Sequence, residues 1–250
     1  RCVPFRVAAD GRPAPRAGAG SLAADAGRLL ASAWNTLTMA LATMIIASRA
    51  AQGLALLVAL SAVMERAIKP LAVVLQVTPV VAIAPLVVIW AGIDNPERAI
   101  VALAAVVAFF PIFSGAVTGL KAADPDLERL FDLYGVGRVK RLLRLRAPSA
   151  VPYLMEGHKV AAGLALIGAV VAEFVAGSGG AQGLAWRILE AGNRLQTARM
   201  FAALVVLGLM GALLYAGLAR LARAGLRWWR GRYPRAKPTT LKLAEPQSSA

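Results

Sequence analysis

Long apolar runs are the feature of this sequence that most restricts its fold. A helix needs about 20 apolar residues to cross the roughly 30 Å of hydrocarbon in a bilayer. Hydrophobic residues make up 58% of the 250 residues, a share that a soluble domain seldom reaches. The sequence therefore predicts an all-α, polytopic membrane protein, with about five spans in a domain over residues 33–230. The apolar runs cover residues 37–63, 71–90, 99–120, 160–176 and 201–219.

Basic residues lie mainly between and after these runs. The formal net charge is +15, and Lys and Arg concentrate in residues 121–159 and after the last run. The positive-inside rule places such segments in the cytoplasm. This predicts a multi-pass protein of a bacterial inner membrane with a cytoplasmic C-terminus and with the turn at Asp94 and the loop at Gly177 outside. Because this rule explains the charge and no nucleic-acid-binding motif accompanies it, we expect no nucleic-acid partner.

The two ends of the sequence have a different composition. Residues 1–32 are rich in Ala, Gly, Pro and Arg, and we expect a mobile arm there. Residues 231–250 are expected to form a basic, disordered cytoplasmic tail. An odd number of spans would place the arginines of the arm outside, against the positive-inside rule. We therefore expect the natural chain to start earlier, with one more span before Trp34.

The segment 124–148 carries the most distinctive pattern between the apolar runs. Its first half repeats apolar residues at helical spacing and places charged residues on the opposite face. Asp126 is the predicted N-cap, and Gly135 allows a sharp turn. A second, basic helix follows, which Pro148 and Pro152 are expected to close. Two short amphipathic helices around a glycine suit a membrane surface and can offer one face to a protein partner.

This segment resembles the cytoplasmic coupling loop of permease subunits in bacterial ABC importers. The family pattern is Glu-Ala-Ala, three residues, Gly, nine residues, Ile, any residue, Leu-Pro. Gly135 stands at the glycine, and residues 145–148 (Leu-Arg-Ala-Pro) stand at the Ile-x-Leu-Pro position. The Glu-Ala-Ala triplet falls on residues 129–131 (Arg-Leu-Phe), where the acid is absent. Residues 70–222 also look like the nitrate, sulfonate and taurine branch of these permeases, for example in residues 75–79 (Leu-Gln-Val-Thr-Pro).

The resemblance implies a type I ABC importer permease fold, with six spans in the family, and several partners. These are ABC ATPase subunits, a second permease copy that we expect to form a homodimer, and a periplasmic substrate-binding protein. The sequence has no Gly-x-x-x-x-Gly-Lys-Ser/Thr phosphate loop, so ATP and magnesium are assigned to the partner chain, and this chain is not expected to be an enzyme or to hold a cofactor. The residues expected to couple to the ATPase are Glu128, Arg129, Leu130, Phe131, Gly135, Leu145 and Pro148.

Polar and aromatic residues inside the spans are the candidates for the translocation path, because intramembrane polar groups are costly and often line a pathway. For several of them a structural role is the simpler alternative. Thr78 can bond the carbonyl one turn back, Phe109 can pack in the interior, and Glu173 stands near the outer end of its span. The candidates are Gln76, Thr78, Trp90, Phe109, Ser114 and Glu173.

Three glycines, one histidine and one cysteine indicate how the helices pack and whether a metal site is expected. Gly157, Gly163 and Gly168 stand among alanines and suit close approach of two helices. The one histidine, His158, is expected to be a solvated side chain at the cytoplasmic edge. With this histidine and one cysteine, Cys2, the sequence offers no cluster of metal ligands and no catalytic constellation.

The resemblance favours a small organic anion or a vitamin precursor as cargo. The first group includes sulfonates, taurine and nitrate, and the second includes pyrimidine-like and riboflavin-like compounds. The residues around Gly135 and the run 172–174 (Ala-Glu-Phe) favour the vitamin-precursor group. The alternative is a stand-alone secondary transporter or channel. A carrier of that kind usually shows paired inverted repeats and intramembrane charges for ion coupling, and the sequence shows neither.

Overall fold

The computed structural model of the chain describes residues 25–91, 95–176 and 183–232. Within these ranges the regular elements are all helices, and four are long and apolar enough to cross a membrane. Together with one shorter apolar helix, they confirm the predicted all-α, multi-span fold. The four are α2 (Ala26–Leu60), α5 (Pro96–Lys121), the continuous helix from Arg138 to Val175, and α10 (Thr197–Arg232).

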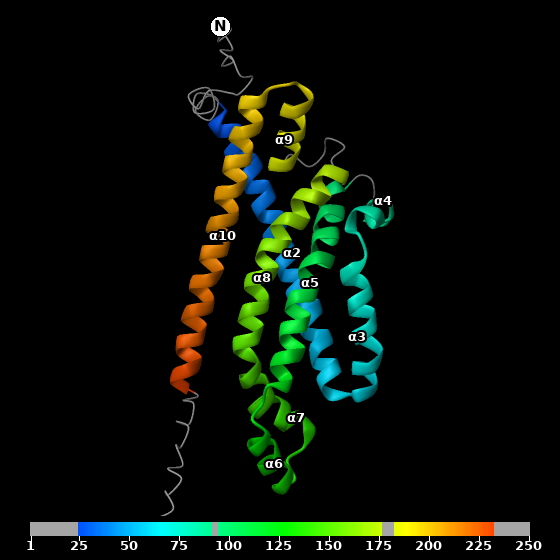
Figure 1. Cartoon of the computed structure of the whole chain (residues 1–250), viewed down its shortest axis with the longest axis vertical. Coiled ribbons are helices and arrows are strands. Elements are labelled where there is room, and N and C mark those ends of the chain that lie inside the picture. The colour runs from blue at the N-terminus through cyan, green and yellow to red at the C-terminus, as the bar shows by residue number, and fades with distance from the viewer. Residues whose placement is uncertain (1–24, 92–94, 177–182, 233–250) are drawn as a thin grey trace, which may run out of the picture.

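Several short helices lie at the two ends of the long ones, whereas α3 runs alongside them (Figure 1). In Figure 1, α6 and α7 lie at one end, with the last turns of α10, whereas α9, the start of α5 and the end of α8 lie at the other. We call the first of these the coupling end and the second the outer end; which end faces the cytoplasm stays a prediction. The remaining elements are α3 (Ala62–Val77), α4 (Val80–Ala91), α6 (Pro125–Leu133), α7 (Arg138–Arg141), the π-helical turn η1 (Leu142–Arg146), α8 (Ala147–Ala176) and α9 (Leu184–Asn193).

Close backbone approach holds α5 against α8. A Cβ atom added at Gly157 would lie 2.6 Å from the carbonyl oxygen of Pro111, and one added at Gly168 would lie 3.0 Å from Cα of Ala104. Small residues let membrane helices approach this closely, so that dispersion contacts replace the missing hydrophobic drive. The packing role predicted for Gly157 and Gly168 is therefore confirmed. An added Cβ at Gly163 meets no atom of the described chain within 4 Å.

The apolar run 71–90 is not one helix. α3 ends at Val77, and Thr78 is extended, with φ −70° and ψ 124°, before Pro79. A residue before proline is pushed out of the helical region, and Pro79 cannot supply the next N–H to the helix. The prediction of one continuous helix over this run is wrong: α3 and α4 have 16 and 12 residues, and neither is long enough to cross a membrane alone.

The first long helix begins earlier than predicted. α2 starts at Ala26, and Leu29 and Ser32 are already buried. The expected arm over residues 1–32 therefore overlaps this helix in its last seven residues, 26–32. Residues 1–24 of that arm, and the tail from residue 233, lie outside the described residues.

Pro148 and Pro152 do not close the second coupling helix. The helix continues from Arg138 through η1 into α8 and ends at Ala176. Pro152 lacks the N–H that would bond the carbonyl of Pro148, and the indole N–H of Trp229 in α10 donates to that carbonyl at 2.7 Å. A proline is tolerated in a long membrane helix when a neighbour satisfies the freed carbonyl in this way.

Candidate functional site

The coupling unit, residues 124–148, begins with a proline-started helix. Asp124 is the N-cap of α6, because its Oδ1 accepts a hydrogen bond from the amide of Asp126 at 2.9 Å. Pro125 occupies the first helical position, where its missing N–H costs nothing. The predicted N-cap, Asp126, was therefore two residues too late. Asp126 instead pairs with Arg129 on the exposed side of the helix.

Gly135 ends α6 in the left-handed conformation, with φ +62°. The amide of Val136 donates to the carbonyl of Phe131 at 3.0 Å, and the amide of Gly135 donates to the carbonyl of Asp132 at 3.0 Å. This pair of bonds is a Schellman cap, which favours glycine at the left-handed position. An added Cβ at Gly135 meets nothing within 4 Å. The requirement for glycine therefore comes from backbone strain and not from lack of space.

A charge clamp, made of Glu128, Asp132, Arg141 and Arg146, joins the two coupling helices. Arg146 Nε donates to Glu128 Oε1 at 2.7 Å, and Arg141 Nη1 lies 3.4 Å from Glu128 Oε2. Arg141 also pairs with Asp132, one turn along α6. The Glu128 side chain is 21% exposed, so solvent screens the clamp less than an ordinary surface ion pair. The clamp fixes α6 against the helix that becomes α8.

The leucines of α6, and Tyr134 at its end, are exposed. Leu133 and Tyr134 are 83% and 75% exposed. Exposed apolar side chains gathered on a small unit mark an interaction site. The coupling unit therefore presents exposed apolar side chains to whatever covers it, beside the exposed acids Asp126 and Asp132. The exposed apolar residues of the coupling unit are Leu127, Leu130, Leu133, Tyr134, Val139 and Leu143.

The predicted coupling residues take different places in this unit. Leu145 is buried and anchors the second helix. Phe131 and Pro148 are half-buried, whereas Arg129 and Leu130 are exposed. Glu128 and Gly135 act inside the unit, through the clamp and the cap. Contact of these residues with an ATPase stays a prediction.

The predicted path residues lie on different helices and have different surroundings. Thr78 Oγ1 donates to the carbonyl of Val74 at 2.7 Å. This is the local hydrogen bond that the sequence analysis named as the structural alternative to a role in the path. Trp90 is 77% exposed on α4. Phe109 stacks on Phe113, with ring centroids 5.4 Å apart. Ser114 is half-buried on α5. The side chain of Gln76 lies outside the described residues.

Glu173 caps a helix. Its side chain is fully buried, and its two carboxylate oxygens accept hydrogen bonds from the amides of Ala185 and Trp186, at 3.3 and 3.2 Å. These amides belong to the first turn of α9, where a carboxylate is favoured by unpaired N–H groups and the helix dipole. Gly183 stands at the N-cap because a Cβ there would collide with the carboxylate. Glu173 thus ties the end of α8 to α9; a role in the path stays a prediction.

The expectation of a solvated His158 is wrong. His158 is half-buried, and its Nε2 lies 2.8 Å from Oγ of Ser48 in α2. Its Nδ1 lies 2.7 Å from the carbonyl of Leu154, and Gln52 donates to Ser48 Oγ at 2.6 Å. The three polar side chains therefore connect α2 with α8. Hydrogen bonds of this kind help to hold membrane helices together.

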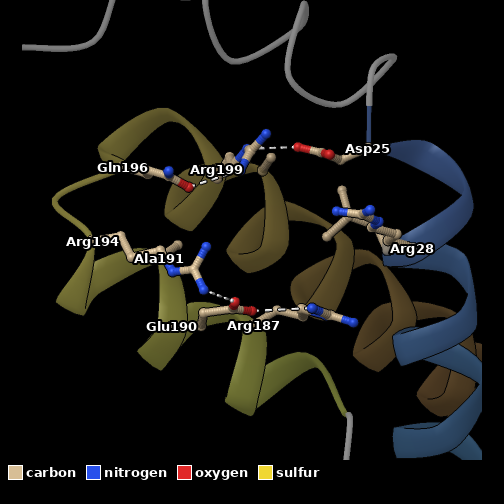
Figure 2. Close-up of a pocket in the computed structure, with 10 residues that line it drawn as sticks. Asp25, Arg28, Arg187, Glu190, Ala191, Arg194, Gln196 and Arg199 are labelled. Carbon is tan, nitrogen blue, oxygen red and sulfur yellow. Dashed lines mark hydrogen bonds and ion pairs between the residues drawn. The ribbon is translucent and has the colours of Figure 1, made fainter.

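A polar cavity of about 80 Å³ opens at the outer end, between α2, α9 and the start of α10. Figure 2 shows Glu190 bonded to Arg187 and Arg194, each at 3.0 Å. Arg199 reaches Asp25 at 2.7 Å on the opposite side of the cavity. Sequence reasoning missed this cavity, because its arginines come from segments more than 150 residues apart. The four arginines that line it are Arg28, Arg187, Arg194 and Arg199.

Comparison with known proteins assigns the family. Residues 51–227 match the family model described as the binding-protein-dependent transport system inner membrane component. The chain belongs to this family. The match includes the whole coupling unit and most of the described helices. The family is therefore the one that the coupling segment resembles, and its members are transport subunits. In the described part of the permease, no three His, Cys, Asp or Glu side chains gather as a metal site would require.

Individual relatives are named for different cargoes. The permease is 36% identical over 166 residues to the formylaminopyrimidine transport permease protein of Halalkalibacterium halodurans, covering 66% of this chain and 64% of that protein. It is 34% identical over 165 residues to the riboflavin transport system permease protein of Chloroflexus aurantiacus, covering 66% and 60%. It is 27% identical over 154 residues to a putative aliphatic sulfonates transport permease protein of Bacillus subtilis, covering 62% and 54%. The chain thus spans less than two thirds of the length of these relatives.

Proposed function

We propose that this permease forms the translocation path of a bacterial ABC importer and is driven by a separate ATPase subunit that grips the coupling unit. The observation that carries the proposal is the exposed apolar surface of that unit. Its backbone is fixed by the Schellman cap at Gly135 and its two helices by the clamp between Glu128 and Arg146. A surface that is apolar, exposed and held in one shape is suited to bind a protein partner.

The coupling unit is connected to the membrane spans by a continuous helix and by packing contacts. The second coupling helix is continuous with α8, which packs closely on α5 through Gly157. Trp229 links α10 to the same point through the carbonyl of Pro148. A partner that tilts α6 would therefore pull on α8 and, through it, on α5 and α10. Two such arrangements of packed helices would provide access from alternate sides.

The position of the coupling unit determines which side of the membrane each end of the molecule is proposed to face. An ATPase that uses cellular ATP is in the cytoplasm, so the coupling end would face the cytoplasm. The last turns of α10 lie at that end, which supports a cytoplasmic C-terminus (Figure 1). The outer end, with its arginine-lined cavity, would receive a periplasmic binding protein. Leu204, Leu209 and Leu213 are exposed on α10 and would face lipid or a second permease copy.

The cargo proposed is a small organic anion or a vitamin precursor. Relatives named for formylaminopyrimidine and riboflavin transport share 36% and 34% identity with this chain. The relative named for aliphatic sulfonates shares 27%. These values favour a vitamin precursor. Thermal-shift screening of the binding protein encoded beside this permease against both groups of compounds tests this choice, and stabilisation by a sulfonate alone would reverse it.

Substitution of the two hinge glycines tests the docking proposal. Gly135→Val forces a β-branched residue into a left-handed backbone, whereas Gly137→Val falls at φ −59°, which any residue adopts. Neither added side chain meets a neighbouring atom within 4 Å at Cβ. We expect Gly135→Val to lose the co-purifying ATPase and Gly137→Val to keep it, with equal amounts of both variants in the membrane. Equal co-purification would contradict the proposal, and uptake by the purified chain without nucleotide would support a secondary transporter.

A further inference from the structure

A second cavity, of about 340 Å³, lies where the coupling unit meets the ends of α2 and α5. One wall is apolar and comes from the last turns of these two spans. The basic part of the lining, called the basic wall, comes from the end of α5 and from the second coupling helix. The apolar wall includes Ala55, Val58, Val117 and Leu120, and the basic wall consists of Lys121, Arg138, Arg141 and Arg146.

The basic wall carries more positive charge than its neighbours neutralise locally. Glu65 is the acidic residue of the lining, and it pairs with Lys121. Arg141 and Arg146 share the acids of the clamp, yet Arg141 Nε is buried and has no hydrogen-bond partner among the described residues. Arg138 forms no ion pair within the described part of the chain. The cavity therefore offers an anion the guanidinium of Arg138, which no acid of the described residues pairs with.

The position of the cavity favours an amphipathic anion over a free one. Leu60 ends α2 and Lys121 ends α5, so the cavity begins where two predicted spans stop. Its apolar residues belong to the ends of the spans, and its basic residues belong to the end of α5 and to the coupling unit. On the cytoplasmic side of membranes, basic pockets between spans bind anionic lipid headgroups, and a basic residue near an anionic surface contributes about 1 kcal/mol.

We propose that this cavity holds the phosphate of an anionic phospholipid, with the first part of an acyl chain along Ala55 and Val58. The inference rests on the proposed function in one respect, the cytoplasmic position of the coupling unit. The phosphate would bridge Arg138 of the coupling unit and Lys121 of α5. The lipid would thereby strengthen the connection between the unit that a partner moves and the span that responds.

Lipid retention by the purified full chain tests the proposal. The protein is exchanged into mixed micelles of phosphatidylglycerol and phosphatidylcholine, and bound lipid is counted by native mass spectrometry. We expect selective retention of phosphatidylglycerol. Arg138→Gln should reduce that retention about fivefold, as expected for one cation near an anionic headgroup. The matched control is Arg144→Gln, which removes an exposed arginine of the same helix outside the cavity lining and should leave retention unchanged.

Two results would overturn the proposal. One is equal retention of the two lipids, or an equal effect of Arg138→Gln and Arg144→Gln. The other is displacement of phosphatidylglycerol by millimolar inorganic phosphate, which would assign the site to a free oxyanion. Because the measurement needs no ATPase, its failure is distinguishable from failure of the proposed function, which is read from ATPase co-purification.

Discussion

Arg146 Nε donates to Glu128 Oε1 across 2.7 Å, and this bond joins the first coupling helix to the base of a membrane span. Glu128 lies one residue before the position where the family pattern has its glutamate. In this chain the acid faces the neighbouring helix and stabilises the shape of the coupling unit. The exposed surface of the unit includes apolar side chains such as Leu130 and Leu133.

Removal of the Glu128 carboxylate should loosen the coupling unit. Glu128→Ala leaves Arg146 and Arg141 without their shared acceptor in a partly buried place, which we expect to cost about 1–3 kcal/mol. The thermal midpoint of the purified protein should fall, and less ATPase should co-purify. The control is Asp126→Ala, because Asp126 pairs with Arg129 in a fully solvated position. Equal effects of the two substitutions would contradict a structural role for the clamp.

Enlargement of Gly157 should separate α5 from α8. In Gly157→Ala the new methyl group would lie 2.6 Å from the Pro111 carbonyl oxygen, so the helices must move apart, at a cost of about 1–3 kcal/mol. Gly163→Ala, on the same helix, places its methyl group in open space. Thermal unfolding in detergent should show a lower midpoint for Gly157→Ala and no loss for Gly163→Ala. A similar change in both midpoints would show that the close contact is not a source of stability.

Glu173 should matter for the stability of the outer end. Glu173→Gln replaces one acceptor oxygen by an NH₂ group facing the amides of α9, which should cost about 1–3 kcal/mol and expose the start of α9 to proteases. Glu97→Gln changes an exposed carboxylate at the same end and should have little effect. If Glu173 lines the path instead, its substitution should alter the KM for uptake while the protease pattern and thermal midpoint remain those of the wild type.

Features that depend on local sequence could be predicted, and features that depend on a distant partner could not. The spans follow from apolar runs of sufficient length, and the turn at Gly135 follows from a glycine between two amphipathic patterns. The break at Thr78 and the continuity through Pro148 could not be told apart, because both sites contain proline. The difference lies in what satisfies the backbone: Trp229 donates to the freed carbonyl of Pro148, and it is 81 residues away.

In the candidate site, too, the type of residue could be predicted from local sequence, but its contacts with distant residues could not. Glu173 and His158 were recognised as polar residues in apolar surroundings, but their roles depend on tertiary neighbours. Glu173 meets the first turn of α9 across a glycine-rich connection, and His158 meets Ser48 from a helix 110 residues away. Sequence spacing places neither pair together, since helix rotation and register decide which side chains meet.

Chemical cross-linking at position 133 tests most directly whether a separate ATPase subunit binds the coupling unit. Leu133→Cys is introduced with Cys2→Ser, the removal of the natural cysteine, and the permease is co-expressed with the ATPase encoded beside it. A short bifunctional thiol- and amine-reactive reagent should give a permease–ATPase adduct, because Leu133 is among the most exposed residues of the unit. Leu213→Cys, exposed on α10 within the span, should give none. Absence of the adduct, with Leu133→Cys labelled by an impermeant reagent from the outer side of intact cells, would contradict the proposed coupling.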